Sequence, residues 1–218
     1  MTDRAQQETL IATARAMQAA GLNRGTAGNL SVRFLHAGRD GFFITPSGRD
    51  YASLIPEDIP WLPLAEGADG HEGGKPPSSE WRMHHDLYVQ RPEAGAVLHA
   101  HSTFAVALSC LRREIPPFHY MIARFGGATV RCAAYALFGS QALSDCALAA
   151  LQDRSACLLA NHGMLVYGRN LQQALDKGVE LEALCEHYAR AAQLGTPVLL
   201  SREEMTAALE RFQTYGAA

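Results

Sequence analysis

The chain has 218 residues, of which 48% are hydrophobic, and this suits one domain with a substantial core over residues 1–218. Its formal net charge of -3, without a basic run interleaved with aromatic residues, excludes the charge pattern of nucleic-acid-binding proteins. No apolar segment approaches the roughly 20 residues that span a bilayer, and the first residues are polar where a signal peptide would be apolar. We therefore expect a cytoplasmic protein with no nucleic-acid or membrane partner.

The first third of the chain predicts a helix followed by a β-hairpin. Apolar residues recur at helical spacing over residues 8–20, and Gly21 follows where a helix C-cap would lie. Residues 29–33 alternate in polarity, and residues 41–45 are apolar and β-branched, so both are expected to be strands. The Gly-, Pro- and acid-rich stretch 56–77 is expected to be a connection with one short strand.

The middle of the chain predicts helices that alternate with strands. A helix is expected over residues 78–90, with a serine as its N-cap, Glu80 in its first turn and a proline just beyond its end. Later elements follow from the same signals: strands over 96–99, 128–132, 157–160 and 164–167, and helices over 102–111, 140–152, 171–193 and 201–213. Such alternation predicts a layered α/β domain with a mixed sheet.

The five cysteines are scattered and include no Cys-x-x-Cys pair. Several lie in apolar periodic segments, as is typical of reduced cysteines in a core. We expect all five to be reduced core residues.

Two histidines one residue apart, His99 and His101, follow an apolar run, and His162 follows another. In an extended chain alternate side chains point to the same side, so His99 and His101 can converge on one ion. Three protein ligands with an open fourth position are typical of catalytic zinc. The spacing alone leaves a second interpretation open, in which two polar residues leave a strand and the third lies in an unrelated loop.

Three short segments are compatible with phosphate binding. Residues 25–29 and 45–48 are loops of small residues, and the pair Ser78 and Ser79 begins a predicted helix. Exposed backbone N–H groups, hydroxyls and a helix N-terminus can together surround a phosphate. Ordinary turn and capping roles are the alternative for each segment taken alone.

Glu80 directly follows the serine pair. Next to a divalent ion, a carboxylate can be a resting-state ligand, a general base or both, whereas in a first helical turn it more commonly compensates the helix dipole. His84 lies one turn further along and could bind a metal together with Glu80. We favour a packing or hydrogen-bonding role for His84.

Five segments resemble the class II aldolase/adducin family in order and spacing: 25–33, 44–48, 77–82, 99–101 and 161–163. The resemblance spans nearly the whole chain. It continues through residues 115–123, 135–139 and 211–216, which point to the fuculose-phosphate branch of the family.

This resemblance implies a three-layer α/β/α fold around a mixed, mostly antiparallel sheet. It also implies a C4 homotetramer with one zinc ion per subunit, in a cleft between neighbouring subunits. The zinc ligands would be His99, His101 and His162, with Glu80 as the resting-state fourth ligand and proton-transfer residue. Tyr120 and, from the adjacent subunit, Tyr215 would act at the aldehyde-derived oxygen. The residues that would hold the substrate phosphate are Thr26, Asn29, Ser47, Gly48, Ser78 and Ser79.

The implied reaction is the reversible cleavage of a ketose 1-phosphate, such as L-fuculose 1-phosphate, to dihydroxyacetone phosphate and a short aldehyde such as L-lactaldehyde. Alternatives within the family are a 5-deoxyribulose 1-phosphate aldolase, a ribulose 5-phosphate 4-epimerase and a methylthioribulose 1-phosphate dehydratase. Glu80 argues against the epimerase branch, which has aspartate after the two serines. A non-catalytic, adducin-like scaffold would be expected to have lost the ligands that this chain has.

An imine mechanism is a further alternative, because some aldolases use a lysine. Only Lys75 and Lys177 occur in the chain. Neither lies in an apolar run that would lower its pKa, so we favour metal chemistry.

Overall fold

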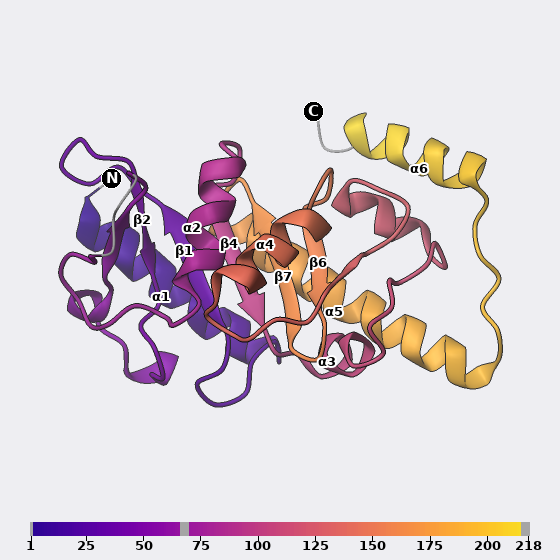
Figure 1. Cartoon of the computed structure of the whole chain (residues 1–218), viewed down its shortest axis with the longest axis horizontal. Coiled ribbons are helices and arrows are strands. Elements are labelled where there is room, and N and C mark those ends of the chain that lie inside the picture. The colour runs from indigo at the N-terminus through magenta and orange to yellow at the C-terminus, as the bar shows by residue number, and fades with distance from the viewer. Residues whose placement is uncertain (1, 66–69, 215–218) are drawn as a thin grey trace.

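The computed structural model describes residues 2–65 and 70–214 (Figure 1). Its helices are α1 (Asp3–Ala19), α2 (Trp81–Gln90), α3 (Thr103–Ser109), α4 (Gln141–Ala150), α5 (Leu171–Leu194) and α6 (Arg202–Thr214), with 3₁₀ helices η1 (Tyr51–Ser53), η2 (Pro56–Asp58) and η3 (Tyr120–Phe125). Its strands are β1 (Asn29–Arg33), β2 (Gly41–Ile44), β3 (Trp61–Pro63), β4 (Ala96–Ala100), β5 (Cys132–Ala133), β6 (Ala156–Leu159) and β7 (Gly163–Gly168).

The seven strands form one sheet in the order β3-β2-β1-β4-β7-β6-β5. Every neighbouring pair is antiparallel except β5 and β6, which are parallel. The expected mixed, mostly antiparallel sheet is confirmed. β4 lies in the middle, between β1 and β7, and all five of its residues are buried.

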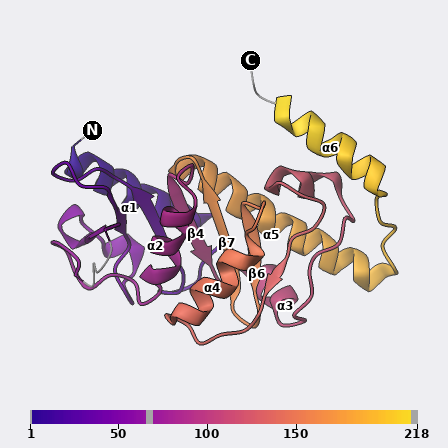
Figure 2. The same ribbon diagram turned by 45° about the horizontal axis from the view of Figure 1, so that its top comes forward.

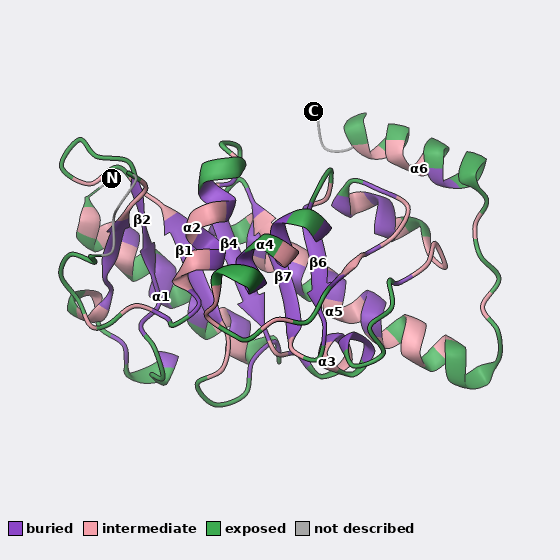
Figure 3. Cartoon of the chain, in the orientation of Figure 1, coloured by how far each residue is buried: buried purple, intermediate pink, exposed green. Residues whose placement is uncertain are grey.

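Helices cover both faces of the sheet, and successive side chains of the central strand β4 pack in two different hydrophobic clusters. On β4, Leu98 packs in the cluster that contains residues of α1, α3 and α5, whereas Val97 packs in the cluster that contains residues of α2 and α4. Figures 1 and 2 show α2 and α4 on one side of the sheet and α5 on the other, and in Figure 3 the strands between them are largely buried. The expected three-layer α/β/α fold is confirmed.

The last helix, α6, lies at one end of the molecule, beyond an extended segment that follows α5 (Figure 2). It packs against η3, where the Phe212 ring stacks on Tyr120 with centroids 6.4 Å apart. Among residues 2–65 and 70–214, no helix is both long and apolar enough to cross a membrane.

Three local expectations are wrong. The strand expected over 128–132 is limited to β5, because Val130 pairs only with Ile115 in an isolated bridge. Glu80, not a serine, occupies the N-cap position of α2, since the Ser78 hydroxyl is engaged in the preceding loop, where it accepts from the Glu80 backbone N–H. All five cysteines are free as expected, but of the five only Cys157 and Cys185 are buried, whereas Cys132 and Cys146 are partly buried and Cys110, at the C-cap of α3, is exposed.

Candidate metal centre and active site

Glu80, His99, His101 and His162 come together, with one ligand atom from each lying within 4.8 Å of all the others. We call these four side chains the metal cluster, because together they could hold one metal ion. The cluster gathers residues from three parts of the chain that the sheet makes neighbours. His99 is on β4, and His101 follows that strand by one residue with the same side-chain direction. His162 lies in the turn between β6 and β7, and β7 pairs with β4.

Gly163 brings the turn close enough to complete the cluster. A Cβ at this position would overlap the carbonyl oxygen of Ala100 and crowd the His101 ring. The neighbouring Asn161 adopts a left-handed backbone with φ 53°, which asparagine tolerates better than most residues. These two residues allow the turn to present His162 to β4.

The ring nitrogens of the cluster face one another. His99 uses Nδ1 to donate to the Met164 carbonyl oxygen at 2.8 Å, which leaves a lone pair on its Nε2. That Nε2 lies 2.9 Å from Nε2 of His101 and 3.2 Å from Oε2 of Glu80. The other carboxylate oxygen of Glu80 lies 3.3 Å from His162 Nε2.

The electrostatics of the cluster favour lone pairs on two of the imidazoles. Burial, together with the charges of His99 and His162, lowers the pKa of His101 to about 4. Burial and the charge of His99 likewise lower the pKa of His162 to about 4. Burial works against the Glu80 charge, but the attraction of His99 outweighs it and lowers the pKa of the carboxyl. Burial works against a charge on His99, but the attraction of Glu80 outweighs it and raises the pKa of His99. At neutral pH the cluster therefore offers a carboxylate and two neutral imidazoles, those of His101 and His162, which are the forms that bind metal ions.

These residues fit a divalent metal ion. Glu80 Oε1 is buried and accepts no hydrogen bond from the described residues, although His162 is its neighbour. A buried carboxylate oxygen without a donor is costly, and a cation among the four side chains would satisfy it. Three imidazoles with one carboxylate are ligands typical of catalytic transition-metal sites.

Two of the loops expected to hold phosphate lie side by side next to this cluster. The Ser47 N–H donates to the Pro76 carbonyl at 3.1 Å, and the Ser78 N–H donates to the Thr45 carbonyl at 3.1 Å. Asn29, at the start of β1, donates from Nδ2 to the Ser78 hydroxyl at 2.9 Å and to Glu80 Oε2 at 3.0 Å. The structure thus brings Asn29, Ser78 and Glu80 together.

The other phosphate candidates are more accessible. Ser47, Gly48 and Ser79 are exposed in the same pair of loops, and Thr26 is exposed in the loop before β1. These residues can therefore meet a ligand from solvent, although the Ser47 N–H already donates to Pro76, and Asn29 and Ser78 are buried.

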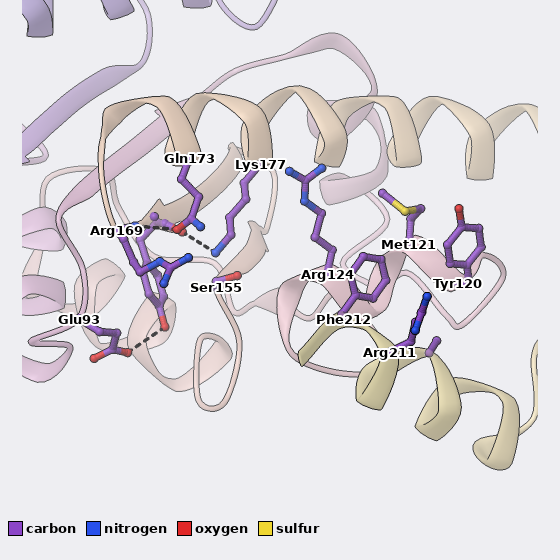
Figure 4. Close-up of a pocket in the computed structure, with 13 residues that line it drawn as sticks. Glu93, Tyr120, Met121, Arg124, Ser155, Arg169, Gln173, Lys177, Arg211 and Phe212 are labelled. Atoms are coloured by element: carbon purple, nitrogen blue, oxygen red, sulfur yellow. Dashed lines mark hydrogen bonds between the residues drawn. The ribbon is translucent and has the colours of Figure 1, made fainter. Parts of the chain in front are cut away.

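Of the two candidate tyrosines, only Tyr120 lies in the described part of the chain, and it is not placed at the cluster of its own chain. Tyr120 is half-exposed and lines a cavity of about 900 Å³ between α5, η3 and α6, not the small cavity at the cluster. Figure 4 shows Gln173 and Lys177 reaching into it from α5, with Arg211 and Phe212 on α6 opposite. Tyr215 lies outside the described residues.

Lys177 corrects one expectation from the sequence. Burial, with the charges of Arg124 and Arg169, lowers its pKa to about 8. Its local sequence is polar, and its burial comes from tertiary packing at the larger cavity. Lys177 does not line the cavity at the metal cluster.

Comparison with known proteins identifies the family to which the sequence belongs. The sequence model for the class II aldolase and adducin N-terminal domain matches residues 8–189. The chain belongs to the class II aldolase and adducin family. It is 51% identical, over 95% of its own length and 90% of the relative's, to the 5-methylthioribulose-1-phosphate/5-deoxyribulose-1-phosphate aldolase of Rhodospirillum rubrum.

Fuculose-phosphate aldolases are also similar to this class II aldolase. The chain is 44% identical to the L-fuculose phosphate aldolase of Escherichia coli (strain K12), over 95% of this chain and 94% of that one. A solved structure of an L-fuculose 1-phosphate aldolase superposes with a TM-score of 0.88 at 38% identity, covering 95% of both chains. This metal-dependent lyase therefore has relatives named for several sugar phosphates. The comparisons do not favour the fuculose-phosphate branch over the others.

The small cavity of this class II aldolase includes residues that the sequence did not suggest as site residues. It has a volume of about 250 Å³ and contains Glu80, His101 and His162 together with Tyr135, Phe138 and Asn161. Tyr135 and Phe138 are exposed at its rim. Two exposed aromatic residues in one short irregular segment are the signal that could have identified this rim.

Proposed function

We propose that this class II aldolase reversibly cleaves ketose 1-phosphates to dihydroxyacetone phosphate and a short aldehyde. The observation that carries the proposal is the position of Glu80, whose carboxylate lies between three converging imidazoles on one side and the Asn29–Ser78 contact on the other. A proton-transfer group is thereby held between a candidate metal site and a candidate phosphate loop. Retro-aldol cleavage of a phosphorylated ketose needs both.

For the metal we propose zinc, one ion per subunit, held by His99, His101 and His162 with Glu80 as the resting-state ligand. When bound, a divalent cation supplies Lewis-acid stabilisation of negative charge that develops on substrate oxygens. Glu80 is then the group that exchanges a proton with C3 of dihydroxyacetone phosphate. Glu80 is mostly buried, which limits the contact of its carboxylate with bulk water.

We propose that the substrate phosphate enters from the exposed side of the paired loops and is held by their hydroxyl and N–H groups. Asn29 and Ser78 form the buried floor of this site. The complete set is Thr26, Asn29, Ser47, Gly48, Ser78 and Ser79.

A homotetramer with C4 symmetry and a site between subunits is part of the proposal. It is supported by Tyr120, which stacks on Phe212 of α6 and does not line the cluster cavity of its own chain. Tyr120, which lies away from the cluster cavity of its own chain, and Tyr215 would both reach the site of a neighbouring subunit and protonate the aldehyde-derived oxygen there. Mixing inactive Glu80→Gln and Tyr215→Phe subunits should restore part of the activity, because mixed tetramers contain some intact sites. No recovery after verified subunit exchange would contradict the shared site.

For the aldehyde portion of the substrate, the named relatives fall into two groups: aldolases for 5-deoxy-type ribulose phosphates and aldolases for fuculose phosphate. The 51% identical relative is named for substrates with a 5-deoxy or 5-methylthio end, and the exposed aromatic rim of Tyr135 and Phe138 suits such an apolar end. We therefore propose 5-deoxyribulose 1-phosphate and 5-methylthioribulose 1-phosphate ahead of L-fuculose 1-phosphate.

The test is kcat/KM for these three ketose phosphates, with product identification. Higher values for the two deoxy-type substrates support the order given, and a higher value for L-fuculose 1-phosphate reverses it. A methyl or hydroxyl difference is worth about 1 to 3 kcal/mol, so a ratio of about 10 to 200 is expected. An epimerised or dehydrated product with no dihydroxyacetone phosphate would instead support the epimerase or dehydratase alternative.

A further inference from the structure

A buried chain of hydrogen bonds leads from Glu80 into the layer between the sheet and α2. Asn29 bonds to Glu80 through Nδ2 and to His84 through Oδ1. On the other side of the imidazole, Nδ1 of His84 lies 2.7 Å from the Ser31 hydroxyl, which lies 2.8 Å from the Tyr88 hydroxyl. All of these side chains are at least nine-tenths buried.

The secondary structure explains why these residues meet. Asn29 and Ser31 are two apart on β1, so they point to the same face of the sheet. His84 and Tyr88 are four apart on α2, so they lie on one face of the helix. Asn29 also pairs with His99 across β1 and β4. This chain of hydrogen bonds therefore joins the metal cluster to α2, the helix that follows Glu80.

The direction of every proton in the chain follows from Glu80. An ionised carboxylate only accepts, so the Asn29 group that faces it must be the NH₂. Oδ1 of Asn29 then accepts from Nε2–H of His84, which leaves Nδ1 as an acceptor for the Ser31 hydroxyl. Tyr88 in turn donates to Ser31. One orientation satisfies all members, and burial lowers the pKa of His84 to about 3, so its imidazole is neutral at physiological pH, as this orientation requires.

The Asn29 amide has two orientations of nearly the same shape, which differ in the hydrogen bonds that its oxygen and nitrogen can make. In the reversed orientation Oδ1 would face the Glu80 carboxylate and repel it, and both the bond to Glu80 and the N–H donated to Ser78 would be lost. A reversed amide is disfavoured by these losses and, in addition, by the donor that faces Oδ1. That donor is His84.

We propose that His84 is a positioning residue, which acts through Asn29 to hold the Glu80 carboxylate in line with both the metal cluster and the phosphate loop. The inference rests on the proposed function for its catalytic meaning. Its structural part stands on its own, because Glu80 is one of the four clustered ligand groups whatever the substrate. Ser31 and Tyr88 support His84 by fixing its tautomer.

The test compares His84→Gln, which keeps an N–H donor for Asn29, with His84→Leu, which removes it. Two quantities are measured: the zinc affinity of metal-stripped protein, by competition with a chromophoric chelator, and the exchange of the C3 proton of dihydroxyacetone phosphate. Removal of a group that orients a metal ligand typically costs 10- to 100-fold in affinity or activity. We expect losses of about this size in both quantities for His84→Leu, and recovery of most of each loss in His84→Gln.

Leu87→Ala is the matched control, because Leu87 is fully buried on the same helix but takes no part in these hydrogen bonds. It should lower the stability while the zinc affinity stays close to that of the wild type. If His84→Leu and His84→Gln are equally impaired, or if His84→Leu matches the wild type in both quantities, the positioning role is wrong. Should His84→Leu fail to fold, Ser31→Ala removes the donor to Nδ1 with a smaller change in volume. It should shift both quantities in the same direction, and wild-type values would overturn the proposal.

The two measurements also separate this inference from the proposed function. A wild-type protein that binds zinc but neither exchanges the C3 proton nor cleaves a ketose 1-phosphate would end the aldolase proposal. The zinc affinities of the His84 variants would still decide whether His84 positions Glu80.

Discussion

Asn29 donates a 3.0 Å hydrogen bond from its side-chain amide to Oε2 of Glu80. The same amide nitrogen lies 2.9 Å from the Ser78 hydroxyl, so one buried side chain links the candidate phosphate loop to the carboxylate of the metal cluster. In the proposed function, binding of the substrate phosphate and transfer of a proton would therefore share one structural element, the side chain of Asn29.

Glu80→Gln should separate binding from chemistry. The amide keeps the shape of the carboxylate but cannot remove a proton, so exchange at C3 of dihydroxyacetone phosphate should fall by about 100-fold or more. Binding of dihydroxyacetone phosphate, measured calorimetrically, should persist because the loop hydroxyl and N–H groups are unchanged. The exposed Glu57 provides the control substitution Glu57→Gln. Exchange at the wild-type rate in Glu80→Gln would remove Glu80 from its proposed role.

The burial of neutral His84 should be visible in the pH dependence of stability. Its folded pKa is about 3 and its unfolded pKa is about 6.5, so between these values the unfolded chain binds the additional proton. The folded state therefore loses stability as the pH falls from 6.5 toward 3, by about 2 to 3 kcal/mol at pH 4.5 from this residue.

Urea unfolding of metal-stripped wild type and His84→Gln at pH 7.5 and 4.5 measures this contribution. The wild type should lose more free energy of unfolding than the variant over that interval, because glutamine does not titrate. Equal losses in the two proteins would mean that His84 is not buried in its neutral form.

Gly163→Ala should disturb the metal cluster through the backbone. The new Cβ would overlap the Ala100 carbonyl oxygen, and forced overpacking of this kind costs about 1 to 3 kcal/mol. Because His162 directly precedes this glycine, zinc affinity should fall together with the free energy of unfolding. Gly195→Ala is the control, since its Cβ would meet nothing within 4 Å. Unchanged zinc affinity in a destabilised Gly163→Ala would show that His162 does not depend on this close approach.

Lys177 has a lowered pKa of about 8, which makes it the lysine to test for imine formation. It lies in the larger cavity, away from the small cavity at the metal cluster. Borohydride reduction in the presence of dihydroxyacetone phosphate should therefore leave the mass of the protein unchanged. A covalent adduct on Lys177 that inactivates the enzyme would favour a lysine mechanism instead.

Parts of this site could be predicted from local sequence. The spacing of His99 and His101 needs only the alternation of a strand, and the family resemblance indicated Glu80 and His162. The hydrogen bonds between Asn29 and His84 could not be predicted in the same way, because they depend on β1 lying beside β4 and beneath α2. The burial of Lys177 likewise depends on tertiary packing, since its neighbours in sequence are polar.

The fold shows a similar division. Hydrophobic periodicity predicted most helices and strands, whose ends lie within a few residues of the expected ones. The expected strand over 128–132 is shorter because Val130 pairs outside the sheet, and the start of α2 is shifted because Ser78 serves the loop instead of the helix. In the first case a contact distant in sequence outweighed a local preference, and in the second a local turn at Ser78 did so.

The proposed activity is cleavage of a ketose 1-phosphate with a metal ion held by Glu80, His99, His101 and His162. The most direct measurement is dihydroxyacetone phosphate release from 5-deoxyribulose 1-phosphate by zinc-loaded, chelator-treated and zinc-reconstituted protein. We expect release by the loaded enzyme, its loss with the chelator, and its recovery when one zinc ion per subunit is restored. Release that persists in fully metal-stripped protein, or a protein that binds no stoichiometric zinc, would contradict the proposed metal-dependent cleavage.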